Sequence, residues 1–190
     1  MINSFYACGD ALGEYQFTHI GGYEAELAVK NLLLPFKTRR DYTKAVWTTY
    51  TEPQVAHSGY TEKSAKETGK FGKTVSKSFS EVDRSIIEED TKGFVKLVLD
   101  PKGKIIGATV VSKEAGEIIS LLSLAIAEKL KISALQKFIY PYPTKSEMLK
   151  LLALDHLQNS VAPWQRKFMK KWLSRPVNNG AGKEHQKNRR

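Results

Sequence analysis

The sequence predicts an α+β fold in which an antiparallel sheet carries helices gathered on one side. Strand-like composition occurs in four short stretches, at residues 45–50, 74–79, 94–99 and 104–111. The last two flank Asp100-Pro101-Lys102-Gly103, where proline fixes φ at the second turn position and glycine tolerates the later bend. We therefore expect a hairpin there, with helical spacing before and after the group of strands.

The segment before the strands predicts a loop followed by a helix. Gly9-Asp10 breaks the chain, and residues 23–34 carry small and apolar side chains at helical spacing until Pro35 ends the run. Such a segment has no core of its own. Between the first two strands, Thr61 begins and Gly69 ends a further short helix.

Residues 114–130 predict a buried helix, because isoleucine, leucine and alanine cover most of its circumference. A helix that is apolar all round lies either under a sheet or between subunits. Two more helices follow, since residues 133–136 and 144–147 fit the capping box, in which a Ser or Thr hydroxyl accepts from the third backbone N–H. The strand-containing domain is thus expected over residues 36–157, preceded by a segment at 1–35 and followed by a tail at 158–190.

Composition places the chain among soluble globular proteins. A hydrophobic content of 41% in 190 residues suits one domain plus appendages. A single cysteine, Cys8, excludes an internal disulfide framework, and we interpret it as a small buried residue rather than a nucleophile. The first residues lack the features of a secretory signal, so a cytoplasmic location is expected. The apolar run at 118–127 is broken by serines and predicts a buried helix rather than a membrane span.

The net charge of +10 belongs mainly to the tail, where residues 164–190 hold nine Lys or Arg and one acid. Trp164, Phe168 and Trp172 recur every four residues with basic side chains on the other side, as in a basic amphipathic helix. Its aromatic face could dock on the domain or on a partner subunit. Residues 164–175 could instead contact an anionic membrane surface, which would make the protein membrane-peripheral, while nucleic acid is the least favoured partner. Residues from 178 onward predict disorder.

Two separated motifs resemble the C-terminal part of the pyridine nucleotide-disulfide oxidoreductases, the family of dihydrolipoamide dehydrogenase and mercuric reductase. They are Phe5-Tyr6-Ala7-Cys8-Gly9-Asp10 and Pro141-Tyr142-Pro143-Thr144-Lys145-Ser146-Glu147-Met148. The intervening segments also resemble the family, at residues 46–53, 55–62, 96–98, 103, 106–108 and 115–119. The similarity thus extends from residue 5 to about 153. It implies the dimerisation domain fold of FAD- and NAD-linked reductases over 36–157, with 1–35 as the end of the FAD-binding domain.

The resemblance also implies flavin contacts. At the matching positions the family directs an aspartate, here Asp10, to the ribityl chain of FAD, and the N-terminus of the next helix, here Thr18 and His19, to the flavin ring. In an intact family enzyme NAD(P)H is the co-substrate. This sequence contains one cysteine rather than the catalytic pair and no G-x-G-x-x-G, so we expect the chain alone to bind FAD weakly or not at all and to be inactive.

Tyr142 departs from the family pattern, because the disulfide reductases have an acid/base histidine immediately before Pro-Thr. Tyrosine titrates near 10 and is a poor base at neutral pH, although its hydroxyl can donate a hydrogen bond or contact a metal ion. Tyr142 and Glu147 are thus the candidate catalytic residues. Interface packing for Tyr142 and simple helix capping for Glu147 stay open. We expect no metal site, since the four histidines lack metal-ligand spacing.

The resulting hypothesis is the dimerisation part of a flavin-dependent NAD(P)H oxidoreductase that acts as a homodimer. A separate chain could carry the FAD and NAD domains. The alternative is a non-enzymatic dimerising module whose basic tail binds a membrane or a polyanion.

Overall fold

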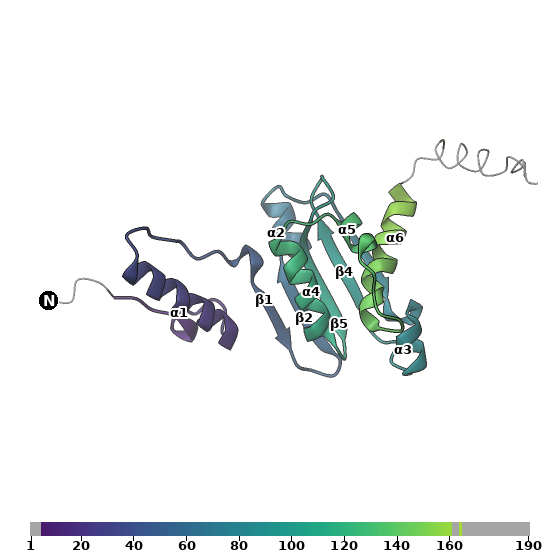
Figure 1. Ribbon diagram of the computed structural model, residues 1–190, viewed down its shortest axis with the longest axis horizontal. Helices are drawn as coiled ribbons and strands as arrows, with labels where there is room; N and C mark the ends of the chain where they lie inside the picture. Colours follow the sequence, from purple (N-terminus) through teal and green to yellow (C-terminus); the bar gives the residue numbers. More distant parts are fainter. Residues whose placement is uncertain (1–4, 161–163, 165–190) are drawn as a thin grey trace, which may run out of the picture. The chain divides into compact units, whose positions relative to one another are not determined.

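The computed structural model describes residues 5–160 and Trp164 of the chain (Figure 1). These residues form one unit up to Leu154 and a second from Asp155. The elements, in chain order, are η1 (Gly9–Leu12), α1 (Thr18–Leu33), η2 (Tyr42–Lys44), β1 (Val46–Thr49), β2 (Gln54–Gly59), α2 (Glu62–Glu67), β3 (Lys73–Ser78), η3 (Phe79–Glu81), α3 (Asp83–Ile87), β4 (Phe94–Leu99), β5 (Ile105–Ser112), α4 (Ala115–Ala127), α5 (Ile132–Lys137), η4 (Lys145–Glu147) and α6 (Met148–Ser160).

The strands form an antiparallel sheet in the order β1-β2-β5-β4-β3, which confirms the predicted α+β class. The prediction missed β2, which pairs with both β1 and β5. This strand buries His57 and Ser58, and buried polar residues obscure the apolar pattern by which strands are recognised. His57 is satisfied internally: Nε2 donates to the carbonyl of Gly59 at 3.0 Å, and Nδ1 accepts from the Thr109 hydroxyl at 2.9 Å.

The hairpin between β4 and β5 forms as predicted. The N–H of Gly103 donates to the carbonyl of Asp100 at 3.0 Å, and Gly103 has a φ of 78°. The Asp100 carboxylate also accepts from the N–H groups of Lys102 and Lys104 at 2.8 Å each. The turn is therefore fixed by local chemistry that the sequence displays.

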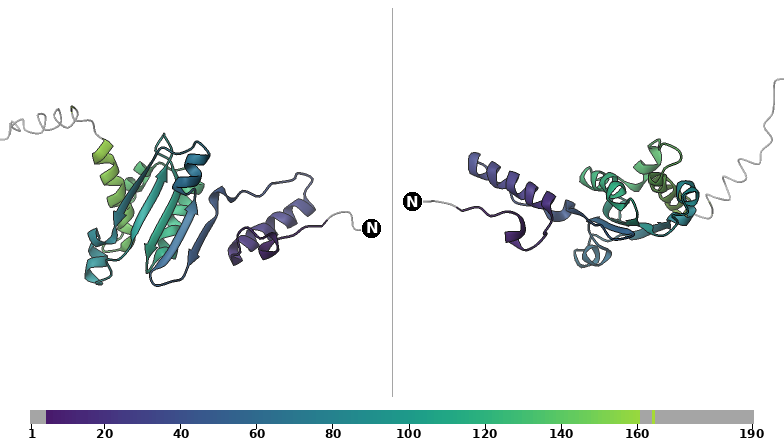
Figure 2. Two further views of the ribbon diagram at one scale, coloured as in Figure 1. Left: turned by 180° about the vertical axis from the view of Figure 1, so that it is seen from behind. Right: turned by 90° about the horizontal axis from the view of Figure 1, so that it is seen from below.

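Helices α4 and α5 and the first part of α6 cover one face of the sheet (Figure 2). The core beneath them includes Val95, Leu97 and Leu99 of β4, each with no exposed surface. Short α2 lies on the opposite face, where Glu62 pairs with Lys96 of β4 at 2.7 Å. The long helix, α4, buries only one of its sides, since Leu121 and Leu124 are 44% and 61% exposed. In the single chain α4 is therefore buried on one side only, and burial of its other side between subunits stays a prediction.

Two predictions of helix starts need correction. Helix α1 begins at Thr18 rather than near residue 23. Its Gly21 lies close to η1, where a Cβ would be 3.2 Å from the Cα of Gly9. Helix α5 begins after Lys131 without the predicted Ser133 cap, because Lys131 pairs with Lys104 and the N–H of Ile132 donates to Gly103. These backbone bonds to the hairpin decide where α5 starts.

Burial lowers the pKa of His57 below 6.5, and its hydrogen bond to Gly59 only partly opposes this. Below pH 6.5 the unfolded chain therefore binds a proton that the native state excludes, so stability should fall as pH drops from 7 through the native pKa. The loss should be about 1.4 kcal/mol for each unit of pKa lowering. Urea unfolding at pH 7.0, 6.0 and 5.0 should show a smaller pH dependence in His57→Gln. Equal slopes in the variant and the wild type would contradict this assignment.

Candidate functional site

Asp10 lies in η1, which packs against α1 and is tied to it by a buried glutamate. Glu24 is only 5% exposed, and its carboxylate accepts from the N–H of Gly9 at 2.6 Å and from the hydroxyl of Tyr42. Burial, and then the hydrogen bond to Glu24, raises the pKa of Tyr42 to about 12, so Tyr42 stays protonated as the donor. Glu24 thereby links the Gly9-Asp10 turn, α1 and the segment that leads into β1.

The N-terminus of α1 is fixed to β1. His19 Nε2 donates to the carbonyl of Val46 at 2.6 Å, and the rings of Phe17 and Trp47 stack with centroids 6.2 Å apart. A pocket of about 350 Å³ opens between α1, β1 and the first half of α4. Its lining comprises Phe17, Thr18, His19, Val46, Trp47, Thr48, Tyr50, Gly116, Ile119 and Ser120.

Asp10 and the first residues of α1 offer the hydrogen-bond acceptor and donors that a flavin requires. Asp10 is exposed, and its carboxylate has no hydrogen-bond partner among residues 5–160. The N–H groups of Thr18 and His19 have no acceptor in the same range, as expected for the first turn of a helix. A carboxylate accepts from a ribityl hydroxyl, and a helix N-terminus favours negative charge. Cys8, expected to be buried, is exposed beside this turn, because η1 lies at the surface.

Tyr142 is 68% exposed, and its hydroxyl donates to the Asp83 carboxylate of α3 at 2.9 Å. This hydrogen bond is the main cause that raises the pKa of Tyr142 above 10, and the charge of Glu147 contributes in the same direction. At neutral pH Tyr142 is therefore a protonated donor. Glu147 lies near enough to Tyr142 for its charge to affect the pKa of the hydroxyl. The hydrogen-bond partner of that hydroxyl is Asp83, which the sequence patterns did not predict.

The predicted capping box at 144–147 does not form. The Thr144 hydroxyl donates to the carbonyl of Pro141 at 2.8 Å and also contacts the Ser146 hydroxyl, rather than accepting from the third N–H. The chain here begins a 3₁₀ turn, in which the N–H of Glu147 donates to the carbonyl of Thr144. Capping therefore does not account for the Glu147 side chain.

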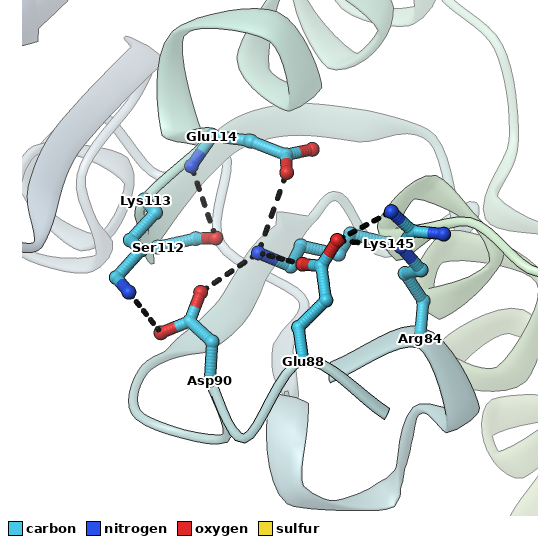
Figure 3. A network of polar contacts seen from close by, with 7 residues as sticks. All are labelled: Arg84, Glu88, Asp90, Ser112, Lys113, Glu114 and Lys145. Carbon is cyan, nitrogen blue, oxygen red and sulfur yellow. Dashed lines mark hydrogen bonds and ion pairs between the residues drawn. The ribbon is translucent and has the colours of Figure 1, made fainter. Parts of the chain in front are cut away.

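Lys145 anchors the segment that carries Tyr142 and Glu147 (Figure 3). Its side chain is 3% exposed, and its ammonium lies 2.7 Å from Asp90, 3.0 Å from Glu88 and 3.3 Å from Glu114. Burial alone would lower the pKa of Lys145, but the hydrogen bonds to Asp90 and Glu88 reverse this and hold it above 10.5. The network joins α3, the loop before β4, the start of α4 and η4. Sequence patterns did not predict it, because its members are far apart in the chain.

The two groups of candidate residues lie toward opposite edges of the sheet. Thr18 and His19 adjoin the edge strand β1, whereas Tyr142 adjoins α3, which follows the other edge strand, β3 (Figure 1). A single chain therefore does not bring Asp10, Thr18 and His19 together with Tyr142 and Glu147. A site that contains both groups needs two chains.

Over residues 5–160 and Trp164, we find no cluster of three or more His, Cys, Asp or Glu side chains arranged to hold a metal ion. In the same residues no helix has the length and apolar character to cross a membrane. The predicted amphipathic helix at 164–175 lies outside the described residues apart from Trp164, which is 70% exposed.

Comparison with known proteins identifies the domain. Residues 45–153 match the family model "Pyridine nucleotide-disulphide oxidoreductase, dimerisation domain". A mercuric reductase of Staphylococcus aureus is 37% identical over 80% of this chain and 28% of its own length. A dihydrolipoyl dehydrogenase of Rhizobium etli is 33% identical over 81% of this chain and 32% of its own length.

Solved structures agree with these matches. The flavoprotein disulfide reductase RclA of Escherichia coli is 27% identical, with a TM-score of 0.68 over 77% of this chain and 34% of its own. LpdA of Mycobacterium tuberculosis, at 22% identity, shares the fold with a TM-score of 0.73 over 80% of this chain and 33% of its own. The chain thus spans about a third of the length of these relatives. It belongs to the pyridine nucleotide-disulphide oxidoreductase family and contains that family's dimerisation domain.

Proposed function

We propose that this chain forms the dimer interface of a flavin-dependent NAD(P)H oxidoreductase and presents Tyr142 and Glu147 to the flavin side of a partner subunit. The observation that carries the proposal is the separation of the two candidate groups toward opposite edges of one sheet. A two-fold dimer can join the Tyr142 edge of one copy to the Asp10 edge of the other. Each site would then take residues from both subunits.

On the flavin side, Asp10 would accept from the ribityl chain of FAD, and the free N–H groups of Thr18 and His19 would face the ring. FAD, when bound, supplies the redox step between NAD(P)H and the acceptor. Glu24 holds the Gly9-Asp10 turn against α1, and His19 and Trp47 hold the start of α1 against β1. The chain's own residues therefore position both contacts. The other cofactor-binding segments would come from the FAD and NAD domains, in the same polypeptide or in a separate chain.

Tyr142 would act as a hydrogen-bond donor rather than as a base. In the free chain its hydroxyl donates to Asp83, so donation to an acceptor requires the hydroxyl to turn away from Asp83. Its raised pKa opposes proton loss at neutral pH. Such a group can stabilise negative charge on an acceptor or on a ligand of a bound metal ion, but it cannot readily take up a proton. This favours an acceptor whose reduction does not depend on an acid/base histidine. Mercuric ion is the first acceptor to test, because relatives of this chain are named mercuric reductases. Cu(II) is the second, because RclA has been solved as a Cu(II) complex.

A chimera tests this role. Residues 5–153 would replace the aligned segment of the staphylococcal mercuric reductase, and NAD(P)H oxidation would be measured with mercuric ion, Cu(II) and a small disulfide. Tyr142→Phe removes one hydroxyl and should lower kcat with the preferred acceptor about tenfold. This is the effect on the rate of losing one hydrogen bond to a group that is charged or becomes charged in the transition state. The matched control is Tyr140→Phe, which removes a hydroxyl that has no hydrogen-bond partner among residues 5–160 and should leave kcat unchanged.

Dimer content of both variants should equal that of the parent, as measured by light scattering. If Tyr142→Phe kept full turnover with every acceptor, Tyr142 would be a packing residue and its catalytic role would be withdrawn. An Asp83→Asn variant adds a check, because it retains an acceptor for the hydroxyl while removing the charge that raises the pKa of Tyr142.

A further inference from the structure

A lysine-lined pocket lies at the end of the sheet where β2 ends and β5 begins, and none of the candidate residues above lines it. It encloses about 220 Å³ between the end of β2, η2, the start of β5 and the end of α4. Lys44, Lys70, Lys104 and Lys129 line it, and no Asp or Glu does. From these observations we propose that the pocket binds the phosphate or diphosphate group of a small anionic ligand.

The lysines are available to such a ligand. Lys44, Lys104 and Lys129 form no ion pair or side-chain hydrogen bond among residues 5–160. Lys70 contacts the hydroxyl of Tyr60, and its ammonium lies 4.6 Å from the centroid of that ring. The nearby Asp41 carboxylate is engaged with the hydroxyl and N–H of Thr43, which are the largest causes that lower its pKa. Asp41 thus neutralises only part of the positive charge around the pocket.

The walls of the pocket strengthen its attraction for an anion. Ile105 and Ile126, which are 1% and 7% exposed, form its apolar floor together with Ile106. A concave site that is lined by one sign of charge over low-dielectric walls concentrates the field and favours counter-ions. Lysine ammonium groups bind phosphate as point charges, and several of them can share one diphosphate. A volume of about 220 Å³ lies below the usual range for whole drug-sized ligands, so the pocket suits the anionic group alone.

The backbone holds the pocket residues in place. The N–H of Tyr60 donates to the carbonyl of Ile106 at 2.9 Å, and a Cβ on Gly107 would lie 1.8 Å from the carbonyl oxygen of Tyr60. Tyr60 therefore lies directly against β5, where its hydroxyl contacts Lys70 and retains its own proton for donation to a phosphate oxygen. Lys129 occupies a left-handed position with a φ of 53°, where glycine or asparagine is usual after a helix. Its side chain lines the pocket at the cost of this unfavourable backbone conformation.

Isothermal titration calorimetry of the full 190-residue chain with inorganic pyrophosphate tests the proposal. The double variant Lys70→Gln/Lys104→Gln should bind pyrophosphate about 10- to 100-fold more weakly, since two charge-assisted contacts are lost. The matched control is Lys63→Gln/Lys102→Gln, which removes the same net charge from two exposed lysines that do not line the pocket. This control should bind as the wild type does, and binding should weaken with added salt.

Titrations with ADP and adenosine distinguish the free anion from a nucleotide. Binding of both pyrophosphate and ADP without binding of adenosine supports recognition of the phosphate group. The absence of pyrophosphate binding in the wild type would overturn the proposal. Equal affinity of the two double variants, whether weakened or not, would overturn it as well, because binding would then reflect overall charge or the basic tail, which every variant retains. Both outcomes are independent of the reductase proposal, since neither assay uses flavin, NAD(P)H or Tyr142.

Discussion

Replacing Lys145 with methionine is expected to lower the free energy of unfolding by about 3 kcal/mol. The methionine keeps the length and apolar stem of lysine but leaves three carboxylates facing one another. Asp90 should dominate the effect, because its side chain is 11% exposed and its other cation, Lys113, is 3.8 Å away. Glu88 retains Arg84, and Glu114 is half exposed, so the cost falls at the lower end of the range for a broken buried ion pair.

Urea unfolding at pH 7 measures this loss, and Lys102→Met on the exposed hairpin provides a control expected to change stability by less than about 0.5 kcal/mol. A double variant, Lys145→Met/Asp90→Asn, removes the buried charge together with its partner. It should therefore be less destabilised than the sum of the two single variants. Simple additivity would mean that Lys145 and Asp90 are not coupled.

The pH dependence follows from the directions of two pKa shifts. Lys145 has a raised pKa, so its contribution is complete below 10.5 and is lost as pH rises through the native value. Glu88 has a lowered pKa, caused first by its hydrogen bond to Lys145, so its contribution is complete above 4.5 and is lost as pH falls through the native value. The stability difference between wild type and Lys145→Met should hence be largest between pH 4.5 and 10.5. A difference that persisted undiminished at pH 3 would indicate lost packing rather than lost charge pairing.

The contrast between the β4–β5 hairpin and the Lys145 network explains which features the sequence could predict. In the hairpin, Asp100, Pro101 and Gly103 fix the turn through bonds within five residues, so the sequence displays the cause directly. In the network, Lys145 and Asp90 are 55 positions apart, and only the folded chain brings them together. A lysine between Thr144 and Ser146 carries no local sign that it will be buried.

The same distinction holds for the elements and the site. Strand β2 escaped prediction because His57 is buried with one hydrogen-bond partner from β5 and another within β2 itself. The capping prediction at Ser133 failed because the hairpin fixes the start of α5. The sequence pointed to Asp10 and Thr18 only through the family resemblance, since an exposed Gly-Asp turn has no distinctive pattern of its own. Asp83 could not be predicted from the sequence, because it meets the hydroxyl of Tyr142 only in the folded chain, where α3 places it there.

Introducing a charge on the exposed side of α4 should abolish dimerisation. Leu121 and Leu124 lie three residues apart on the side of the helix that faces away from the sheet. A single exposed leucine is ordinary, but two on one helix face of a dimerisation domain indicate a contact surface. We therefore expect this side of α4 to be part of the interface. In Leu124→Glu, dimer formation would have to desolvate one carboxylate on each copy near the two-fold axis.

The dimer dissociation constant should rise at least about 1000-fold, which corresponds to about 4 kcal/mol. The monomer should tolerate the change, because Leu124 is 61% exposed and glutamate is a good helix former. Val29→Glu is the matched control, since Val29 is 53% exposed on α1. Multi-angle light scattering at tens of micromolar should give twice the 21.4 kDa chain mass for the wild type and the control, and the monomer mass for Leu124→Glu. A monomer in Val29→Glu and a dimer in Leu124→Glu would move the interface to α1 and would remove the two-fold arrangement on which the shared site depends.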